Sequence, residues 1–307
     1  SVMKPEDNTF RILSIQTTYK CNMTCANCYL GDMLNNPNYE DVHIERFEDA
    51  ISRLPNKTEI RFIGAEPTMN DNLFDMIRIV KKYNHLPSLL TNGLKLAQED
   101  YVINLKKSGL NFLGLSMNGG LDDEVYKRFD NGKFATVKKR ALENCIKHKL
   151  VPHINIIVDP TNIHILKPLL SYIEELCKKY NRKSGIKFPI VIRIKSVGNM
   201  GNYLDTYTYN INELIDIAKE NFGEFVPKFE VNGYKETNTC VYQFESKAGT
   251  IYGKCTDWTV DDDGLPDRGS KRRGILTEDY EIEPFFEYYE TKVDGPRKIK
   301  LELINEK

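Results

Sequence analysis

Three cysteines stand in one short run near the amino end, and their thiolates are the groups in this chain best suited to a soft metal centre. Cys21, Cys25 and Cys28 are separated by three residues and then by two, and thiolates select soft metals and iron–sulfur clusters. A structural zinc site takes four protein ligands, whereas the next His is His43 and the next Cys is Cys145. Three ligands and one open position suit a cubane iron–sulfur cluster with one iron free to bind a small molecule. A zinc knuckle or three unrelated thiols are the alternatives.

The cysteine spacing, with an aromatic residue directly after the third cysteine, resembles the signature of the radical S-adenosylmethionine (SAM) enzymes. The resemblance implies that Cys21, Cys25 and Cys28 bind one [4Fe–4S] cluster and that Tyr29 lies against the adenine region of SAM. It also implies an activity. The open iron holds the amino and carboxylate groups of SAM, and an electron from the cluster cleaves SAM to a 5′-deoxyadenosyl radical.

A second motif, Gly64-Ala65-Glu66-Pro67, follows an apolar run. It resembles the Gly-Gly-Glu-Pro turn of the same family and departs from it at Ala65. Small residues allow a ligand to approach the backbone closely, and Pro67 fixes the turn. The resemblance implies that the Gly64 carbonyl and the Glu66 carboxylate accept hydrogen bonds from the SAM ammonium group. Taken alone, this tetrapeptide also suits an ordinary turn between a strand and a helix.

Polar residues at later strand ends are further candidates for SAM contacts. Ser116 and Asn118 resemble the family's Ser-x-Asp-Gly stretch, with Asn118 in place of the Asp. The amide of Asn118 keeps a hydrogen-bonding group at this position but removes the charge. Asn155 lies inside an apolar run, so its side chain is expected to face the barrel interior or a specific partner. Arg193 and Lys195 point the same way along a strand. They predict a site for the SAM carboxylate or for an anionic substrate, with a solvated sheet face as the alternative.

The elements that must position these residues follow an alternating pattern. The expected strands are 10–17, 59–64, 87–92, 111–117, 151–158 and 189–197, and the expected helices are 43–54, 72–83, 98–108, a long helical region ending near 149, 163–180 and 211–221. Successive strand–helix units predict a parallel α/β sheet with right-handed crossovers. Six units predict a (β/α)6 partial TIM barrel, the fold that the resemblance also implies. Reactive groups in such barrels follow the carboxyl ends of the strands, as the cysteine loop does.

The pattern changes at about residue 223, which divides a barrel domain, 1–222, from a C-terminal region, 223–307. Short β-like runs at 228–234, 239–244 and 250–256 predict a small C-terminal β-hairpin appendage and a tail that closes the open side of the barrel. Cys240 and Cys255 flank this hairpin, as at the start of twitch or SPASM auxiliary-cluster domains, but no cysteine follows Cys255. We therefore expect no second cluster. The two thiols are candidate hydrogen-atom donors to a substrate radical, or a pair packed within the hairpin.

The charge balance, the apolar stretches and the cysteine content of the sequence indicate which partners and which compartment to expect. The 43 basic and 44 acidic residues give a net charge of −1, so no general attraction to nucleic acid or to an anionic membrane is expected. The sequence has no apolar stretch of membrane-spanning length and no signal-peptide pattern, which predicts a cytoplasmic protein. Seven unevenly spaced cysteines fit a reducing compartment better than a disulfide framework.

Two short runs, Thr18 to Asn22 and Leu90-Thr91-Asn92-Gly93, resemble the peptide-modifying branch of the family. The resemblance implies a ribosomal peptide or protein substrate that is matured by epimerisation, cross-linking or excision. It also implies flavodoxin or ferredoxin as the reductant. About a dozen residues precede the first strand, so a separate leader-peptide-binding protein or direct recognition is expected.

Two other functions remain open. One is a radical SAM enzyme for a small metabolite such as a sugar, nucleotide or amino acid. Its phosphate or carboxylate would bind basic side chains, for which the candidates are Arg193, Lys195, Arg272 and Arg273. The other is a non-catalytic protein that binds an iron–sulfur cluster or SAM.

Overall fold

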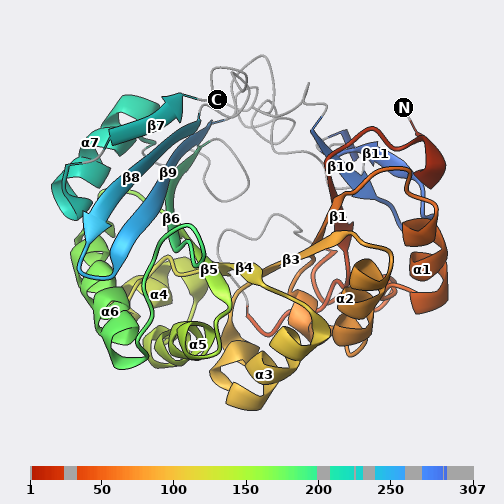
Figure 1. Cartoon of the computed structure of the whole chain (residues 1–307), viewed down its shortest axis with the longest axis horizontal. Coiled ribbons are helices and arrows are strands. Elements are labelled where there is room, and N and C mark those ends of the chain that lie inside the picture. The colour runs from red at the N-terminus through yellow and green to blue at the C-terminus, as the bar shows by residue number, and fades with distance from the viewer. Residues whose placement is uncertain are drawn as a thin grey trace, which may run out of the picture.

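The protein is built on one curved sheet with helices on its outer face (Figure 1). The computed structural model describes residues 2–23, 33–198, 208–224, 226–230, 239–259, 272–285 and 287–288 of the chain. Within these ranges the strand order is β11-β10-β1-β2-β3-β4-β5-β6-β9-β8-β7. The positions of functional groups therefore follow from which strand end and which sheet face each residue occupies.

The first six strands form the parallel part of the sheet in chain order. They are β1 (Ile12–Gln16), β2 (Glu59–Ile63), β3 (Leu86–Thr91), β4 (Phe112–Ser116), β5 (Val151–Ile157) and β6 (Val191–Gly198). Each agrees with an expected strand to within about three residues. The predicted α/β class and (β/α)6 partial barrel are thus confirmed, and the sheet is not closed.

Helices connect these strands and cover the outside of the arc. They are α1 (Ile44–Ser52), α2 (Leu73–Lys82), α3 (Glu99–Ser108), α4 (Asp123–Asp130), α5 (Ala135–Lys147), α6 (Leu166–Lys179) and α7 (Ile211–Phe222), with short 3-10 turns at η1 (Pro5–Asp7), η3 (Pro67–Met69), η4 (Leu94–Ala97) and η5 (Ile163–Ile165). The long helical region expected before residue 149 is two helices. Asn131 ends α4 in the left-handed conformation, with φ of 59°, a helix terminus that Asn and Gly favour.

The apolar core lies between the sheet and the helices. On β2, for example, Ile60 and Phe62 are fully buried, and the Phe62 ring lies 6.0 Å from that of Phe47 on α1. Because alternate strand residues point to opposite faces, Glu59 and Arg61 point to the inner face of the arc. The same alternation places a set of polar and basic side chains inside the barrel.

The C-terminal strands continue both edges of this sheet. β9 (Gly249–Thr259) pairs in parallel with β6, and it forms an antiparallel hairpin with β8 (Thr239–Ser246), which in turn pairs with β7 (Val226–Glu230). At the opposite edge, β10 (Arg273–Leu276) pairs in parallel with β1 and is followed by the antiparallel β11 (Ile282–Pro284). The expected hairpin is therefore present, and it extends the arc.

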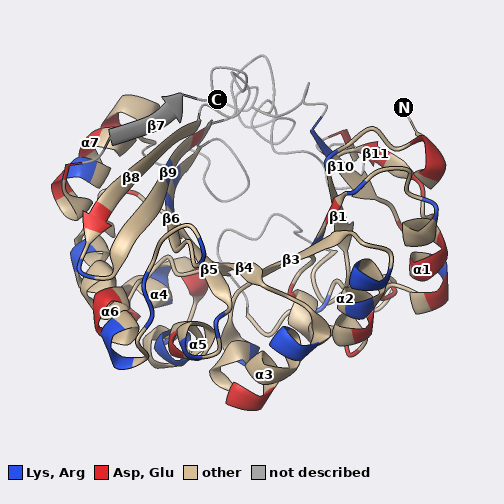
Figure 2. Ribbon diagram, in the orientation of Figure 1, with Lys and Arg blue, Asp and Glu red and all other residues tan. Residues whose placement is uncertain are grey.

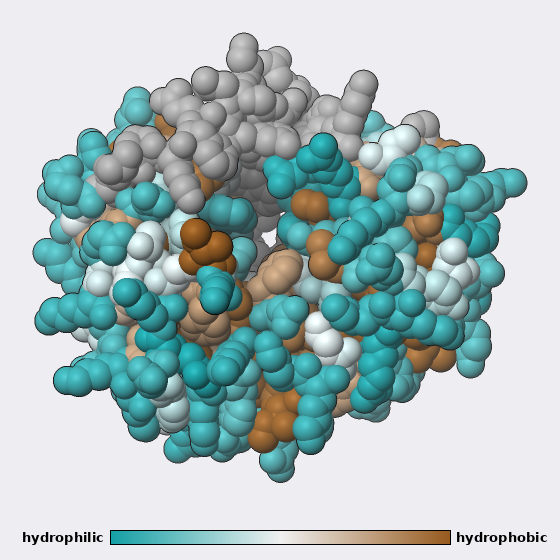
Figure 3. Space-filling model, in the orientation of Figure 1, coloured by the Kyte–Doolittle hydropathy of each residue, from teal (hydrophilic) through white to brown (hydrophobic). Residues whose placement is uncertain are grey.

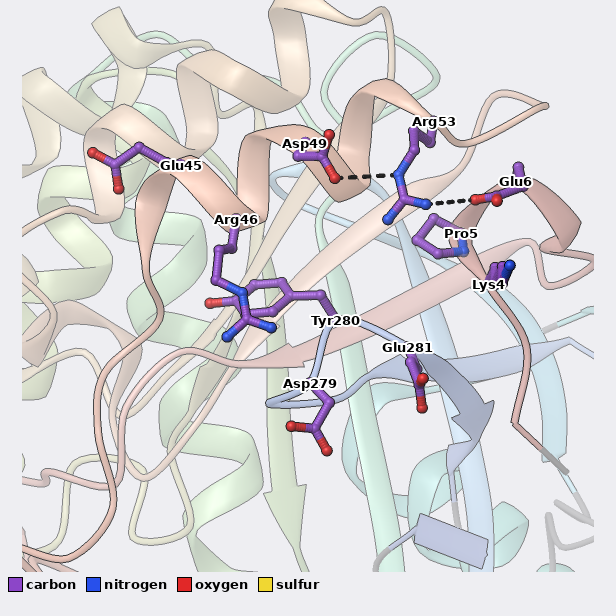
Figure 4. Close-up of a pocket in the computed structure, with 10 residues that line it drawn as sticks. All are labelled: Lys4, Pro5, Glu6, Glu45, Arg46, Asp49, Arg53, Asp279, Tyr280 and Glu281. Atoms are coloured by element: carbon purple, nitrogen blue, oxygen red, sulfur yellow. Dashed lines mark hydrogen bonds and ion pairs between the residues drawn. The ribbon is translucent and has the colours of Figure 1, made fainter.

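Contacts with α1 hold the β10–β11 turn in place. The Tyr280 hydroxyl accepts a hydrogen bond from the His43 backbone N–H at 2.9 Å, and the Arg46 guanidinium lies 4.4 Å from the Tyr280 ring centroid. Figure 4 shows Arg46 and Tyr280 beside a pocket outside the barrel, where Arg53 pairs with Glu6 at 2.8 Å. The pocket combines both charge signs and joins the amino end, α1 and the turn, so we assign it a structural role.

None of the helices within the described ranges is long and apolar enough to cross a membrane.

Candidate active site

The carboxyl ends of β1 and β2 meet at the start of the cysteine run. The Ala65 N–H donates to the Thr18 carbonyl at 3.1 Å, and the Glu66 N–H donates to the Lys20 carbonyl at 2.9 Å. A Cβ atom added at Gly64 would lie 2.8 Å from the Thr18 carbonyl oxygen, closer than such atoms approach. Glycine at this position therefore allows the turn after β2 to pack against the segment that leads into Cys21.

Glu66 is buried beneath this turn, with 1% of its surface exposed. Its Oε1 accepts a hydrogen bond from the Asn92 N–H at 2.7 Å, and its Oε2 accepts from the Thr91 hydroxyl at 2.7 Å. The Thr68 hydroxyl and N–H also donate to Oε2. Burial raises the pKa of the Glu66 carboxyl, and these hydrogen bonds oppose that rise. The carboxylate joins the ends of β2 and β3, and its contact with the SAM ammonium stays a prediction.

Cys21 lies beyond the carboxyl end of β1, and its sulfur accepts hydrogen bonds from two N–H groups. The Met23 N–H donates to Cys21 Sγ at 3.3 Å, and the Asn92 side-chain amide donates to the same sulfur at 3.8 Å. The Asn92 amide also donates to Asn22 Oδ1 at 2.8 Å. Hydrogen bonds from N–H groups favour the negatively charged form of an acceptor. The surroundings of Cys21 thus suit a thiolate ligand.

The other predicted residues of the cysteine run, Cys25, Cys28 and Tyr29, lie outside the described residues. The described part of the chain has no cluster of three or more His, Cys, Asp or Glu side chains placed to hold a metal ion. The fit of an iron–sulfur cluster therefore rests on the sulfur donor set of the sequence and on the N–H groups around Cys21. Thiolates that accept such hydrogen bonds are the ligands of these clusters.

The ends of β4 and β5 are tied together by amide side chains. Asn118 is 3% exposed, its Oδ1 accepts the Ile157 N–H at 2.9 Å, and its carbonyl accepts from Asn162 Nδ2 at 3.0 Å. Ser116 stands beside Asn155 in the parallel register, on the inner face. Asn118 thus holds the strand ends in place, while Ser116 and Asn155 face the interior. Contacts of these residues with SAM stay predictions.

Arg193 and Lys195 of β6 also point inward. In the register, Arg193 stands between Asn155 on β5 and Lys254 on β9. Burial and the neighbouring cations lower the pKa of Arg193 to about 10, and burial together with Arg193 and Arg273 lowers that of Lys195 to about 8. Both side chains are partly buried on the inner face, which differs from a freely solvated sheet face. Their contact with the SAM carboxylate or an anionic substrate stays a prediction.

Cys240 and Cys255 stand opposite each other across the β8–β9 hairpin, and both are buried cysteines that are not joined in a disulfide. They belong to the apolar core that includes Phe222 of α7. Because Lys254 points inward, its neighbour Cys255 points to the outer, helix-covered face. Burial raises the pKa of the Cys255 thiol. The structure places the two thiols in the apolar core rather than on the inner face, and a hydrogen-donor role stays a prediction.

Sequence reasoning missed several polar residues in the site. Asn92 was noted only as part of a resemblance, and its contact with Cys21 depends on how two distant strand ends meet. Lys138 of α5 is fully buried and donates to the Ser116 carbonyl at 2.7 Å. Arg61 and Lys254 alternate with apolar neighbours in their strands, a signal that could have identified them as inward-facing residues.

Comparison with known proteins assigns the family. The family model described as the Radical SAM superfamily matches residues 15–183, more than half of the chain. The chain belongs to the radical SAM superfamily. As a radical SAM enzyme it uses SAM and a [4Fe–4S] cluster, for which Cys21 is the described candidate ligand.

Curated relatives match part of this radical SAM chain. The 7,8-dihydro-6-hydroxymethylpterin dimethyltransferase of Methanocaldococcus jannaschii is 28% identical over 145 residues, which cover 46% of this chain and 28% of that protein. A probable GTP 3′,8-cyclase of Pyrococcus horikoshii is 33% identical over 118 residues, which cover 38% and 36% of the two chains. The radical SAM chain thus spans little more than a third, or less, of the length of these two relatives.

Solved structures share the fold. Streptococcus suis SuiB bound to the precursor peptide SuiA has a TM-score of 0.54 at 14% identity, covering 69% of this chain and 45% of SuiB. TYW1 with a lysine-pyruvate adduct bound has a TM-score of 0.51 at 15% identity, covering 73% of this chain and 77% of TYW1. At these identities the likeness shows the fold alone.

Proposed function

We propose that this enzyme reductively cleaves SAM and uses the resulting 5′-deoxyadenosyl radical to abstract a hydrogen atom from a substrate carbon. One observation carries the proposal. Three segments meet at the carboxyl ends of β1, β2 and β3: the start of the cysteine run, the Gly64-Ala65-Glu66 turn and Asn92. The hydrogen bonds of Glu66 and Asn92 join them. The bound cluster supplies the electron for this chemistry.

The described residues have distinct tasks in this proposal. Cys21 ligates the cluster together with Cys25 and Cys28, while Asn92 directs an N–H group at the Cys21 sulfur. Glu66 fixes the ends of β2 and β3 in position. Preorganised polar groups of this kind hold a cofactor and its reactive atom in a fixed geometry.

A ribosomal peptide is one candidate substrate. It is supported by the sequence resemblance to the peptide-modifying branch, and SuiB, which shares the fold, has been solved with a precursor peptide. In this case the reaction is an oxidoreductase or lyase-type maturation such as epimerisation, cross-linking or excision. A separate leader-peptide-binding protein and a flavodoxin or ferredoxin reductant belong to the same proposal.

A small anionic metabolite is the second candidate, and the inward-facing cations favour it. Arg193, Lys195 and Lys254 occupy neighbouring positions on β6 and β9 inside the barrel. Two relatives bear the names of enzymes acting on GTP and on a pterin. Basic groups within a barrel are suited to phosphate or carboxylate.

The cofactor part of the proposal is tested by anaerobic reconstitution, iron analysis and electron paramagnetic resonance. We expect about four irons per chain, the number in one [4Fe–4S] cluster, and a changed signal of the reduced cluster when SAM is added. Cys25→Ala should lose this cluster, and Cys177→Ala, a change at a buried thiol on α6, should retain it. A spectrum that SAM does not alter would contradict the proposal, and about eight irons would contradict the single cluster.

A further inference from the structure

Basic side chains from several strands converge inside the barrel. Arg193 and Lys254 are adjacent in the β6–β9 register, and Lys195 lies two residues farther along β6 on the same face. Arg61 of β2 and Arg273 of β10 come from the other arm of the arc, and Figure 2 shows basic residues on both arms. Figure 3, in the same view, shows an opening at the centre of the molecule. We call these five residues the basic interior.

The cations of the basic interior act on one another. Burial, then Arg193, Arg61 and Arg272, lower the pKa of Lys254 to about 8, while Glu59 opposes this shift. Burial and the charges of Arg61 and Arg272 lower the pKa of Arg193 to about 10. Charges on separate strands therefore lie close enough together to repel, which raises the free energy of the folded protein.

An acidic side chain neutralises one member of this group, whereas two other members have no such partner within the described ranges. Glu59 pairs with Arg61 at 2.7 Å and accepts a hydrogen bond from Ser88 at 3.0 Å. Arg193 and Lys254 form no hydrogen bond or ion pair with any described residue. Both keep some exposed surface although protein surrounds them. Their donor groups therefore remain available to a ligand in the interior.

His153 is an uncharged polar side chain near the basic interior. Its ring stacks on Phe112 of β4 at a centroid distance of 5.7 Å. Burial, followed by the charges of Lys254, Arg193 and Arg61, lowers the pKa of His153 to about 3. The imidazole is thus uncharged at neutral pH and can accept or donate a hydrogen bond beside the cations.

We propose that the basic interior binds the phosphate or diphosphate group of a small-molecule substrate. This inference rests on the proposed radical SAM function, because it identifies the substrate class of that site. A compact group with two or more negative charges neutralises several converging cations, and guanidinium groups bind phosphate oxygens in a bidentate manner. An acidic peptide brings one charge per side chain, and the SAM carboxylate is a single charge, so each matches this site less well.

The test measures binding of inorganic diphosphate to the reconstituted full chain by anaerobic isothermal titration calorimetry. We expect saturable binding that Lys254→Gln and Arg193→Gln each weaken about tenfold or more, the effect of losing one charge-assisted hydrogen bond. Lys254→Arg should remain within about threefold of the wild type because it keeps the charge. Lys107→Gln, on the exposed side of α3, is the matched control and should bind normally.

Three results would overturn the proposal. The first is no diphosphate binding by the wild type, and the second is equal binding by Lys254→Gln and the wild type. The third is that Arg193→Gln and Lys254→Gln weaken binding of SAM or of a glutamate-rich peptide but leave diphosphate unaffected. Circular dichroism and iron content identify variants that fail to fold. Formation of 5′-deoxyadenosine is measured separately, so a wild type that binds diphosphate without cleaving SAM would refute the proposed function and leave this site standing.

Discussion

At the scale of single residues, Asn92 connects the two halves of the candidate site. Its backbone N–H binds Glu66 at 2.7 Å and its side-chain amide donates to Cys21 Sγ at 3.8 Å. One residue thus contacts both the buried carboxylate and Cys21, the first proposed cluster ligand. Hydrogen bonds to ligating sulfur stabilise the more negative, reduced form of an iron–sulfur cluster.

Asn92→Ala should therefore make the reduction potential of the cluster more negative. We expect a change on the order of 60 mV, which corresponds to about 1.4 kcal/mol for one electron and matches one hydrogen bond to a charged group. A redox titration followed by electron paramagnetic resonance measures it. Asn38→Ala, an exposed position in the same region, is the control. Equal potentials for Asn92→Ala and the wild type would show that the amide does not act on the cluster.

Glu66→Gln should destabilise the protein even without its cofactors. The substitution turns one acceptor oxygen into an amide donor that faces the hydroxyl and N–H donors of Thr68, Thr91 and Asn92. Leaving buried polar groups unpaired in this way costs about 3 kcal/mol. Urea denaturation measures the loss, and the exposed Glu124→Gln should change stability by less than about 0.5 kcal/mol. Similar effects of the two substitutions would contradict the buried role of Glu66.

The sequence was informative where a residue's role depends on its own chain neighbours. The cysteine spacing and the Gly64–Pro67 turn were recognisable because both are local. The contacts of Asn92 and Lys138 were not, since they join segments that are far apart in the chain. Cys240 and Cys255 show the same limit. Their hairpin was predicted, but the face to which they point was not.

At the scale of elements, the hairpin β8–β9 depends on a close contact between Tyr242 and Gly253. The two residues are partners in the register, and a Cβ atom at Gly253 would lie 2.0 Å from Tyr242 Cζ. Tyr242 is fully buried with Phe244, whose ring stacks on Phe222 of α7 at 5.3 Å. The ring can therefore not move aside without disturbing the core beneath α7.

Gly253→Ala should lower the stability of the protein by about 1–3 kcal/mol, the usual cost of forcing extra atoms into a packed site. Thermal unfolding measures the effect. Gly185→Ala is a suitable control because a Cβ there would contact nothing within 4 Å. If both variants unfold at the same temperature, Tyr242 does not pack against Gly253 as described.

The strand pairings show why only part of the fold can be predicted from the sequence. β1 to β6 have local apolar patterns, and each pairs with its neighbour in chain order. β10 pairs with β1 across almost the whole chain, and β9 pairs with β6 after an intervening helix and hairpin. Such partners cannot be deduced from periodicity, because the pattern of a strand does not specify which edge it joins.

At the scale of the whole molecule, the barrel encloses a group of like charges although the chain has a net charge of −1. The net charge of the chain is nearly zero, but the charges are distributed unevenly, with cations gathered on the inner face. This arrangement destabilises the charged form of residues such as Lys254. The pKa of Lys254 falls to about 8 because of burial and of the charges of Arg193, Arg61 and Arg272.

Lys254→Met should be more stable than the wild type near pH 7, by at most about 3 kcal/mol. From pH 8 to 10 the unfolded chain binds more protons at Lys254 than the folded one, so wild-type stability rises with pH in this window. The advantage of Lys254→Met should therefore shrink between pH 8 and 10. Urea denaturation across this range measures both variants. An advantage that does not change with pH would exclude a buried, repelled ammonium group.

The most direct test of the central claim is formation of 5′-deoxyadenosine from SAM by the reconstituted protein with dithionite. We predict product from the wild type and none from Cys25→Ala or Cys21→Ala, because three thiolates are needed to hold the cluster. A wild type that carries its full cluster and binds SAM, yet forms no 5′-deoxyadenosine with or without added substrate, would contradict the account and indicate a protein that only binds these cofactors.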